Sequence, residues 1–321
     1  MKKLLINLIL AGLPLFILIG IYIYNDPFKV IYHFNAYFDP SDSAYFELDD
    51  DYISTQTLIQ NNPEYKYDSY IFGSSRSDNY LVSEWQKHIK GGNCYHFNSA
   101  YETLYGVEKK LLFLKEHHFA LNNALFIYDN ELLAKTENEK GPIRLKHPAL
   151  SGMSWFEFQG EFLKYFFDKD FLFAWLDLRF SGHLKKYMAE QNIMGLDQFN
   201  YKAASNEFLQ SAIEQKLITD SNEFYASRKH IFYERDTAVH YTEKAIGKKQ
   251  LQLLRSIKEI LDENHASYKI VINPLYNQAK MDTTDLKTLQ EIFSEEHVCD
   301  YSGKNQIASN IYNYFETSIT G

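Results

Sequence analysis

Cysteine motifs for metal binding are absent from this sequence. It has only two cysteines, Cys94 and Cys299, and neither belongs to a C-x-x-C pair or a His/Cys cluster with ligand spacing. We therefore expect no metal site. The two thiols are either free or, in an exported domain, able to pair with each other.

Glycine loops for phosphate binding and long basic runs are missing as well. No phosphate-cradling glycine loop and no dinucleotide fingerprint occurs, so we expect no cofactor. Lys and Arg number 33 against 42 Asp and Glu, which gives a formal net charge of -9. This acidic balance argues against nucleic acid as a partner.

Hydrophobic and aromatic residues are plentiful. They include 25 Tyr and 24 Phe, and 45% of the 321 residues are hydrophobic, enough for the core of one large domain. Lys2 and Lys3 precede an apolar run over residues 4–24 whose length suits one bilayer crossing. The run ends in bulky Ile and Tyr, which favours an uncleaved signal anchor over residues 1–25 rather than a cleaved signal peptide. The lysines then predict a single-pass protein of the inner (cytoplasmic) membrane with its C-terminal domain on the extracytoplasmic side.

Residues 26–66 are expected to form a polar juxtamembrane segment. Its acidic stretch "DPSDSAYFELDDDY" is interpreted as a solvated loop, because no cation-binding loop signature supports the alternative of a cation site.

From residue 67 onward, strand and helix patterns alternate. Short strands are predicted in "YDSYIFGSS", "NCYHFNSA", "NNALFIYDNELL", "YKIVINP" and "HVCDYSG". Helices are predicted in "DNYLVSEWQKHI", "TLYGVEKKLLFLKEHH", "TEKAIGKKQLQLLRSIKEILDENH" and "DLKTLQEIFSE". This alternation indicates an α/β domain over residues 67–321, a three-layer fold with a parallel sheet flanked by helices.

An aromatic, mostly helical insertion is expected at about residues 135–241. It contains "SWFEFQGEFLKYFFDKDFLFAWLDLRF", whose aromatics at helical spacing are typical of core packing. The alternative is a cap or lid that faces the substrate, since exposed aromatic surface is often functional.

Polar or small residues follow each predicted strand, where the chemistry of a parallel sheet is found. In "FGSSRS", Gly73 and Ser74 lead to Ser75, but Ser77 replaces the second Gly of a G-x-S-x-G elbow. The stretch instead resembles the first block of the SGNH (GDSL-like) hydrolase superfamily, in its membrane-anchored bacterial envelope type. That resemblance implies a flavodoxin-like fold and makes Ser75 the nucleophile.

The later family blocks match in part. After the second strand the family has a backbone donor, often following an Asn, and here Asn98 and Ala100 stand without the usual Gly. The third block is an Asn of the oxyanion hole, which implies this role for Asn130. Arg76 either binds a substrate anion or anchors the turn through an ion pair, and both readings are open.

The last family block supplies an acid and a His near the C-terminus. Glu316 falls at the acid position, but Ile319 stands where the His is expected. Three explanations are open: a pseudoenzyme, a His supplied elsewhere such as His297, or a shifted reading frame. Losing the first base of CAT TAC AGG turns His-Tyr-Arg into Ile-Thr-Gly, the final residues of this chain.

The resemblance therefore predicts a serine esterase or O-acyltransferase that acts on an envelope glycan or related ester. The alternative is a non-catalytic envelope protein that binds a glycan or a partner.

Overall fold

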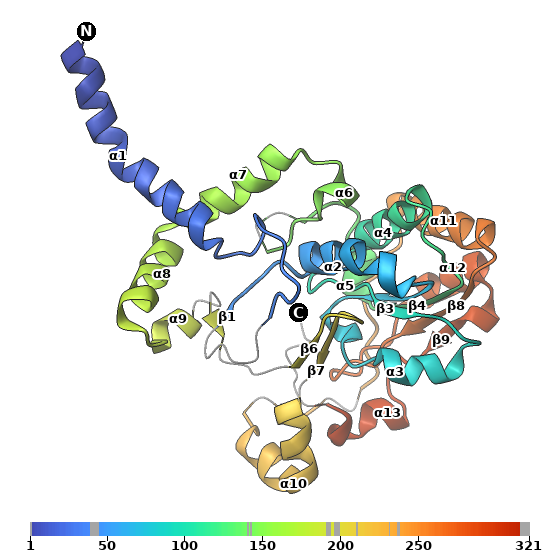
Figure 1. Cartoon of the computed structure of the whole chain (residues 1–321). Helices are drawn as coiled ribbons and strands as arrows, with labels where there is room; N and C mark the ends of the chain where they lie inside the picture. Colours follow the sequence, from blue (N-terminus) through green and yellow to red (C-terminus); the bar gives the residue numbers. More distant parts are fainter. Residues whose placement is uncertain are drawn as a thin grey trace.

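The computed structural model shows an α/β protein built around a parallel sheet (Figure 1). It describes residues 2–38, 45–139, 141, 143–190, 194–195, 200–209, 211–230, 232–235 and 238–314.

The main sheet has five strands in the order β3-β2-β4-β8-β9, and every neighbouring pair is parallel. The strands are β2 (Ser69–Gly73), β3 (Cys94–His96), β4 (Asn123–Tyr128), β8 (Ser267–Ile272) and β9 (Val298–Asp300). All five were predicted from the sequence. If the five strands are numbered by their order along the chain, the sheet order is 2-1-3-4-5, which is a doubly wound arrangement. In such sheets the ligand crevice lies at the carboxyl ends of the first and third strands, here β2 and β4.

Alternate side chains of the strands enter two different cores. Tyr70, Phe72 and Phe126 pack on one face, under α4 (Leu104–Glu116), α11 (Lys248–Glu263) and α12 (Thr283–Phe293). Ile71, Leu125 and Ile127 pack on the other face. That face is covered by α3 (Val82–Trp85) and η2 (Gln86–His88), two short turns where the sequence predicted one longer helix. The sheet therefore lies between two helical layers.

The acidic stretch of residues 39–52 was expected to be a solvated loop, and its last residues instead begin α2 (Asp50–Tyr65), a helix whose residues 51–58 are all buried. Asp49 caps its start by accepting from the backbone N–H groups of Asp51 and Tyr52, both at 3.0 Å. The acidic residues at this end therefore begin a core helix instead of facing water, because caps and buried lysines satisfy them.

The insertion between β4 and β8 is a second body of mixed structure. It contains α5 (Asn130–Ala134), α6 (Pro148–Ser151), α7 (Trp155–Phe166), α8 (Lys169–Ser181), α9 (Lys186–Glu190), β5 (Met194–Gly195), β6 (Asn200–Lys202), β7 (Glu207–Leu209) and α10 (Ser211–Ser227). Strand β5 pairs with β1 (Tyr45–Phe46), and β6 pairs with β7 as a hairpin. The hairpin lies at the β3 edge, where the backbone N–H of His96 donates to Ser205 O at 3.0 Å.

Many aromatics of the insertion are core residues, as packing predicts. Phe158, Phe162 and Phe166 of α7 are buried against Tyr22 and Phe28 near the N-terminus. The ring centroids of Tyr22 and Phe166 lie 5.1 Å apart. This second core joins the insertion to the end of α1 (Lys2–Asn25). Within the described residues, no helix is long and apolar enough for a membrane crossing.

The chain after β9 returns toward the serine block. It forms α13 (Gln306–Ser309) and η4 (Ile311–Asn313), while η3 (Glu295–His297) precedes β9. Both cysteines are free thiols, so they form no disulfide with each other.

Candidate functional site

Ser75 lies at the carboxyl end of β2, in a tight turn. It begins the 3-10 turn η1 (Ser75–Ser77), and its side chain is exposed. Gly73 lets this turn fold back on the sheet: an added Cβ would lie 2.7 Å from Ser77 Cβ and 3.1 Å from Ile127 Cβ. The sequence places a small residue here because the backbone and the next turn touch.

Ser77 and His96 stabilise the turn from its buried side. Ser77 Oγ donates to Ser74 O at 2.6 Å and lies 2.9 Å from His96 Nε2. Burial, followed by the nearby Lys110 ammonium, lowers the pKa of His96 to about 3, so its ring is neutral at physiological pH. This Ser–His pair is buried, and we interpret it as structural.

Arg76 anchors the turn to the next strand. Its guanidinium lies 2.7 Å from Asp129 and 3.3 Å from Glu131, just after β4. Glu131 also pairs with Lys135 at 3.0 Å. Of the two readings of Arg76, the ion pair that anchors the turn is therefore present, with Asp129 and Glu131.

Asn98 is held from several sides in the loop after β3. Its Nδ2 donates to Asp78 Oδ1 at 2.6 Å, and its Oδ1 accepts from Asn206 of the insertion at 3.1 Å. The backbone O of Asn98 accepts from Ser54 Oγ at 2.8 Å and from Lys110 Nζ at 2.7 Å. Both the side chain and the backbone of Asn98 thus help to hold this loop in place.

The two predicted oxyanion donors have different surroundings. The Ala100 N–H donates to the Asp50 carboxylate, so that carboxylate must move before Ala100 can stabilise an oxyanion. Asn130 is the first residue of α5, and its Oδ1 is buried with no hydrogen-bond partner in the described part of the chain. The Asn130 amide therefore keeps unused hydrogen-bonding capacity.

Asp50 and Asp78 form an acidic pair at this edge that sequence reasoning missed. Burial first, and then Glu47, raise the pKa of Asp50 to about 7. Burial and the neighbouring Asp50 raise the pKa of Asp78 well above its ordinary value. The Asp50 carboxyl is thus able to hold a proton near neutral pH.

This pair predicts an unusual pH dependence of stability. The folded pKa of Asp50 lies above its ordinary value, so the native state binds a proton that the unfolded state has lost. Between about pH 8 and about pH 5.5, the Asp50 contribution to stability should therefore rise on the order of 1–2 kcal/mol as the pH falls. Urea unfolding at both pH values should show a smaller rise for Asp50→Asn. The exposed Asp170→Asn is the control, and an unchanged pH dependence in Asp50→Asn would contradict the assignment.

A four-charge cluster lies beneath the loop after β3. Lys146 Nζ is 2.7 Å from Asp51 and 2.6 Å from Glu102, and Lys110 Nζ is 2.6 Å from Glu102 and 3.3 Å from Asp51. All four side chains are almost completely buried. Burial alone would raise the pKa of Asp51, but Lys146 and Lys110 outweigh burial and lower it. We infer that the cluster fixes α2 and the Asn98 loop to each other.

Among the described residues, no histidine is hydrogen-bonded to Ser75. His147 is buried under Tyr52, and burial lowers its pKa to about 4. His297 stacks on Tyr268 at 4.2 Å and precedes β9, at the sheet edge opposite Ser75. Burial, and then Tyr301 and Tyr314 of the chain after β9, raise the pKa of Tyr80 to about 12, so this part of the chain lies near the segment that follows the serine turn. Glu316 and Ile319 lie outside the described residues.

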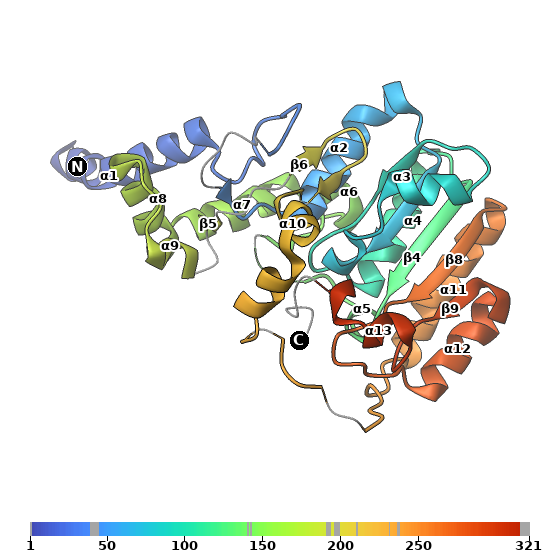
Figure 2. The same cartoon turned by 90° about the horizontal axis from the view of Figure 1, so that it is seen from below.

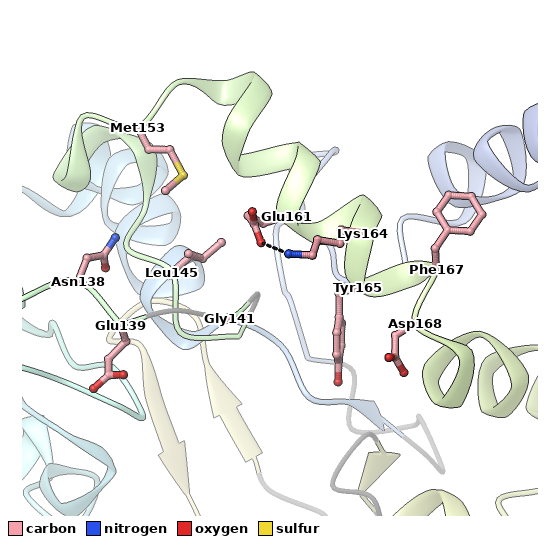
Figure 3. Close-up of a pocket in the computed structure, with 10 residues that line it drawn as sticks. All are labelled: Asn138, Glu139, Gly141, Leu145, Met153, Glu161, Lys164, Tyr165, Phe167 and Asp168. Atoms are coloured by element: carbon pink, nitrogen blue, oxygen red, sulfur yellow. Dashed lines mark ion pairs between the residues drawn. The ribbon is translucent and has the colours of Figure 1, made fainter.

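A pocket of about 770 Å³ opens within the insertion, between the loop after α5 and helix α7 (Figure 3). Figure 3 shows Asn138 and Glu139 on the loop side and Glu161, Lys164 and Tyr165 on α7. Glu139 also pairs with Lys135 at 3.2 Å, and Lys135 pairs with Glu131, the partner of Arg76. A chain of ion pairs therefore connects the pocket rim to the serine turn.

The fold and the site define the class of this protein. It is a doubly wound α/β domain with an exposed serine at the topological switch point of its sheet. Comparisons of the chain with protein-family models, with curated proteins and with solved structures gave no match. No group of three or more His, Cys, Asp or Glu side chains in the described ranges is arranged to hold a metal ion.

Proposed function

We propose that this chain is an SGNH-like, membrane-anchored serine esterase or O-acyltransferase. Its substrate is an O-acylated envelope glycan or a related ester, and the domain lies on the extracytoplasmic side of the inner membrane.

One observation carries the proposal. Ser75 follows β2, Asn98 and Ala100 follow β3, and Asn130 follows β4, and these three strands are adjacent in the sheet. Because all of them are parallel, the three blocks meet at the same edge. The three sequence blocks that carry the resemblance are separated along the chain but follow adjacent strands of the sheet, which supports the proposal.

The proposed chemistry assigns one role to each group. Ser75 Oγ attacks the ester carbonyl and loses its proton to a base, and the alcohol leaves with a proton. Water or an acceptor hydroxyl then attacks the acyl-serine, takes the acyl group and restores the Ser75 hydroxyl. Asn130, together with Ala100 once Asp50 releases it, stabilises the oxyanion. The resemblance makes this base a histidine oriented by Glu316, and the sequence has Ile319 where that histidine is expected.

The direct test is labelling with a fluorophosphonate, which bonds covalently to activated serines. Ser75→Ala should lose at least about tenfold of the labelling, as expected when the nucleophile is removed. Ser83→Ala, at an exposed serine on α3, should label like the unsubstituted chain. Equal labelling of the two variants would show that Ser75 is not the reactive group.

The second candidate is a non-catalytic envelope protein that binds glycan. It is favoured by the Ser75 hydroxyl, which has no hydrogen bond to any base in the described ranges, and by the pocket, in which Tyr165 lies beside carboxylates and an amide. Binding of envelope polysaccharide that survives Ser75→Ala, without ester turnover, would establish this function. Loss of both labelling and turnover in Ser75→Ala would establish the enzyme.

A further inference from the structure

We propose that α7, α8 and the second half of α1 form a lipid-facing surface that lies in the headgroup region of a bilayer. This inference goes beyond the proposed chemistry and does not require a reactive Ser75. The lipid-facing surface consists of the large apolar side chains that these helices expose: Leu13, Leu15, Phe16, Ile17, Ile23, Tyr24, Trp155, Phe156, Phe173 and Phe180.

The exposure of these side chains is unusual for a packed protein. Phe156 is 93% exposed and Phe180 is 88% exposed, although the same helices bury Phe158, Phe162 and Phe171. Helices α7 and α8 therefore have an inner aromatic side that supports the fold and an outer side on which Phe156 and Phe180 point to solvent. Trp155 and Phe173 are also exposed, but each keeps a ring contact, with Phe158 and with Tyr187. Removing an aromatic ring from water is favourable, and these rings remain in water in the isolated chain. We therefore expect an apolar partner to cover them.

The three helices form one continuous region. Tyr22 of α1 packs on Phe166 of α7 at 5.1 Å, and Phe166 packs on Trp175 of α8 at 5.5 Å. Figures 1 and 2 show α1, α7 and α8 together on the side of the molecule away from β8 and β9.

A hollow in this surface suits an acyl chain. A pocket of about 650 Å³ lies between α1 and α7, and its lining is mostly apolar. Ile19, Ile23 and Leu163 contribute aliphatic walls, and Trp155 and Phe156 lie at its rim. A flexible hydrocarbon chain fills such a space without needing hydrogen-bond partners.

A bilayer fits this region better than a protein partner does. In the sequence, this part of α1 is preceded by residues 4–11, which are almost entirely apolar, and by Lys2 and Lys3. Exposed cations lie close by: Arg179 beside Phe180 on α8, Lys164 on α7 and Lys185 just after α8. Lys164 also pairs with Glu161 at 3.8 Å and Lys185 with Asp177 at 2.7 Å. Trp and Tyr beside Lys and Arg are typical of helices at the membrane interface, where rings meet acyl chains and cations meet lipid phosphates.

Trp155 provides a direct measurement in the full-length chain. Two single-tryptophan variants are compared in phosphatidylglycerol vesicles with brominated acyl chains: Trp85→Phe/Trp175→Phe, which keeps Trp155, and Trp155→Phe/Trp175→Phe, which keeps Trp85 on α3. Bromine quenches only rings that touch the acyl chains. We expect the Trp155 emission to fall about twofold or more against unbrominated vesicles, while the Trp85 emission stays unchanged.

Charge substitutions test the same surface. Phe156→Glu combined with Phe180→Glu should abolish the quenching of Trp155, whereas Ile218→Glu, at a side chain of α10 that is 80% exposed, should leave it unchanged. Equal quenching of Trp155 and Trp85 would overturn the proposal. The proposal would also be overturned if the Trp155 emission stays unquenched in vesicles while the ring becomes shielded from water as the protein concentration rises. A second copy of the chain would then cover the surface. Ser75 labelling in the same vesicles reports separately on the proposed chemistry.

Discussion

Lys110→Met should lower the free energy of unfolding by about 3–5 kcal/mol, the usual cost of leaving a buried charge without its partner. The Lys110 side chain is fully buried and lies between Glu102 and Asp51. Its removal leaves two carboxylates against Lys146 alone, in a place that water does not reach. The Asn98 and Phe97 carbonyls lose a donor as well. Urea unfolding monitored by circular dichroism measures the change.

The neighbouring lysine is the matched control. Lys109 pairs with Glu108 at 3.3 Å in a partly exposed position, so Lys109→Met should change stability by less than about 1 kcal/mol. Glu102→Gln in the Lys110→Met background restores neutrality and should recover part of the loss, which a double-mutant cycle quantifies. A loss in Lys110→Met no larger than in Lys109→Met would show that the cluster does not support the fold.

Gly73→Ala should disturb the serine turn itself. The new methyl group would lie 2.7 Å from Ser77 Cβ, so either the turn or β4 must shift. Overpacking of this kind costs about 1–3 kcal/mol, and the displaced turn should also reduce fluorophosphonate labelling of Ser75. Measuring both stability and labelling separates a moved turn from a merely weaker fold.

Gly160→Ala provides the comparison on an exposed helix. A Cβ at Gly160 of α7 meets no atom within 4 Å, and alanine favours the helix by about 0.5–1 kcal/mol. Stability should therefore rise in this variant, with labelling unchanged. If Gly73→Ala behaved in the same way, the close approach of the turn to the sheet would not matter for Ser75.

The strands were predictable because each is a short apolar run that ends in polar residues. "SYIFG" and "NALFIY" are such runs, and they form β2 and β4 at the centre of the sheet. Local patterns also located the glycine and the serine turn that follow β2. These features depend on neighbouring residues, so the sequence is sufficient to find them.

Helix α2 and the charge cluster were missed because they depend on distant residues. Three consecutive acids look solvated until Lys110 and Lys146, far along the chain, are placed beside Asp51. One signal was present: Lys110 falls on the apolar stripe of α4, three residues after Val107 and four before Leu114, and all three are buried. A lysine within such a stripe needs a buried acid. The acidic pair of Asp50 and Asp78 has no comparable signal, because it forms only when α2 meets the serine turn.

The β6–β7 hairpin has a consequence for self-association. Strand β3 is an edge strand, and an uncovered edge can pair with another chain. Ser205 O accepts the His96 N–H, and Asn206 Nδ2 donates to His96 O at 2.7 Å, so the hairpin occupies the groups that a foreign strand would use. Since this cover comes from residues 200–209, more than a hundred positions after β3, a growing chain exposes the edge until the insertion has been made. The hairpin thus blocks pairing of β3 with a strand of another chain, but only after residues 200–209 have been synthesised.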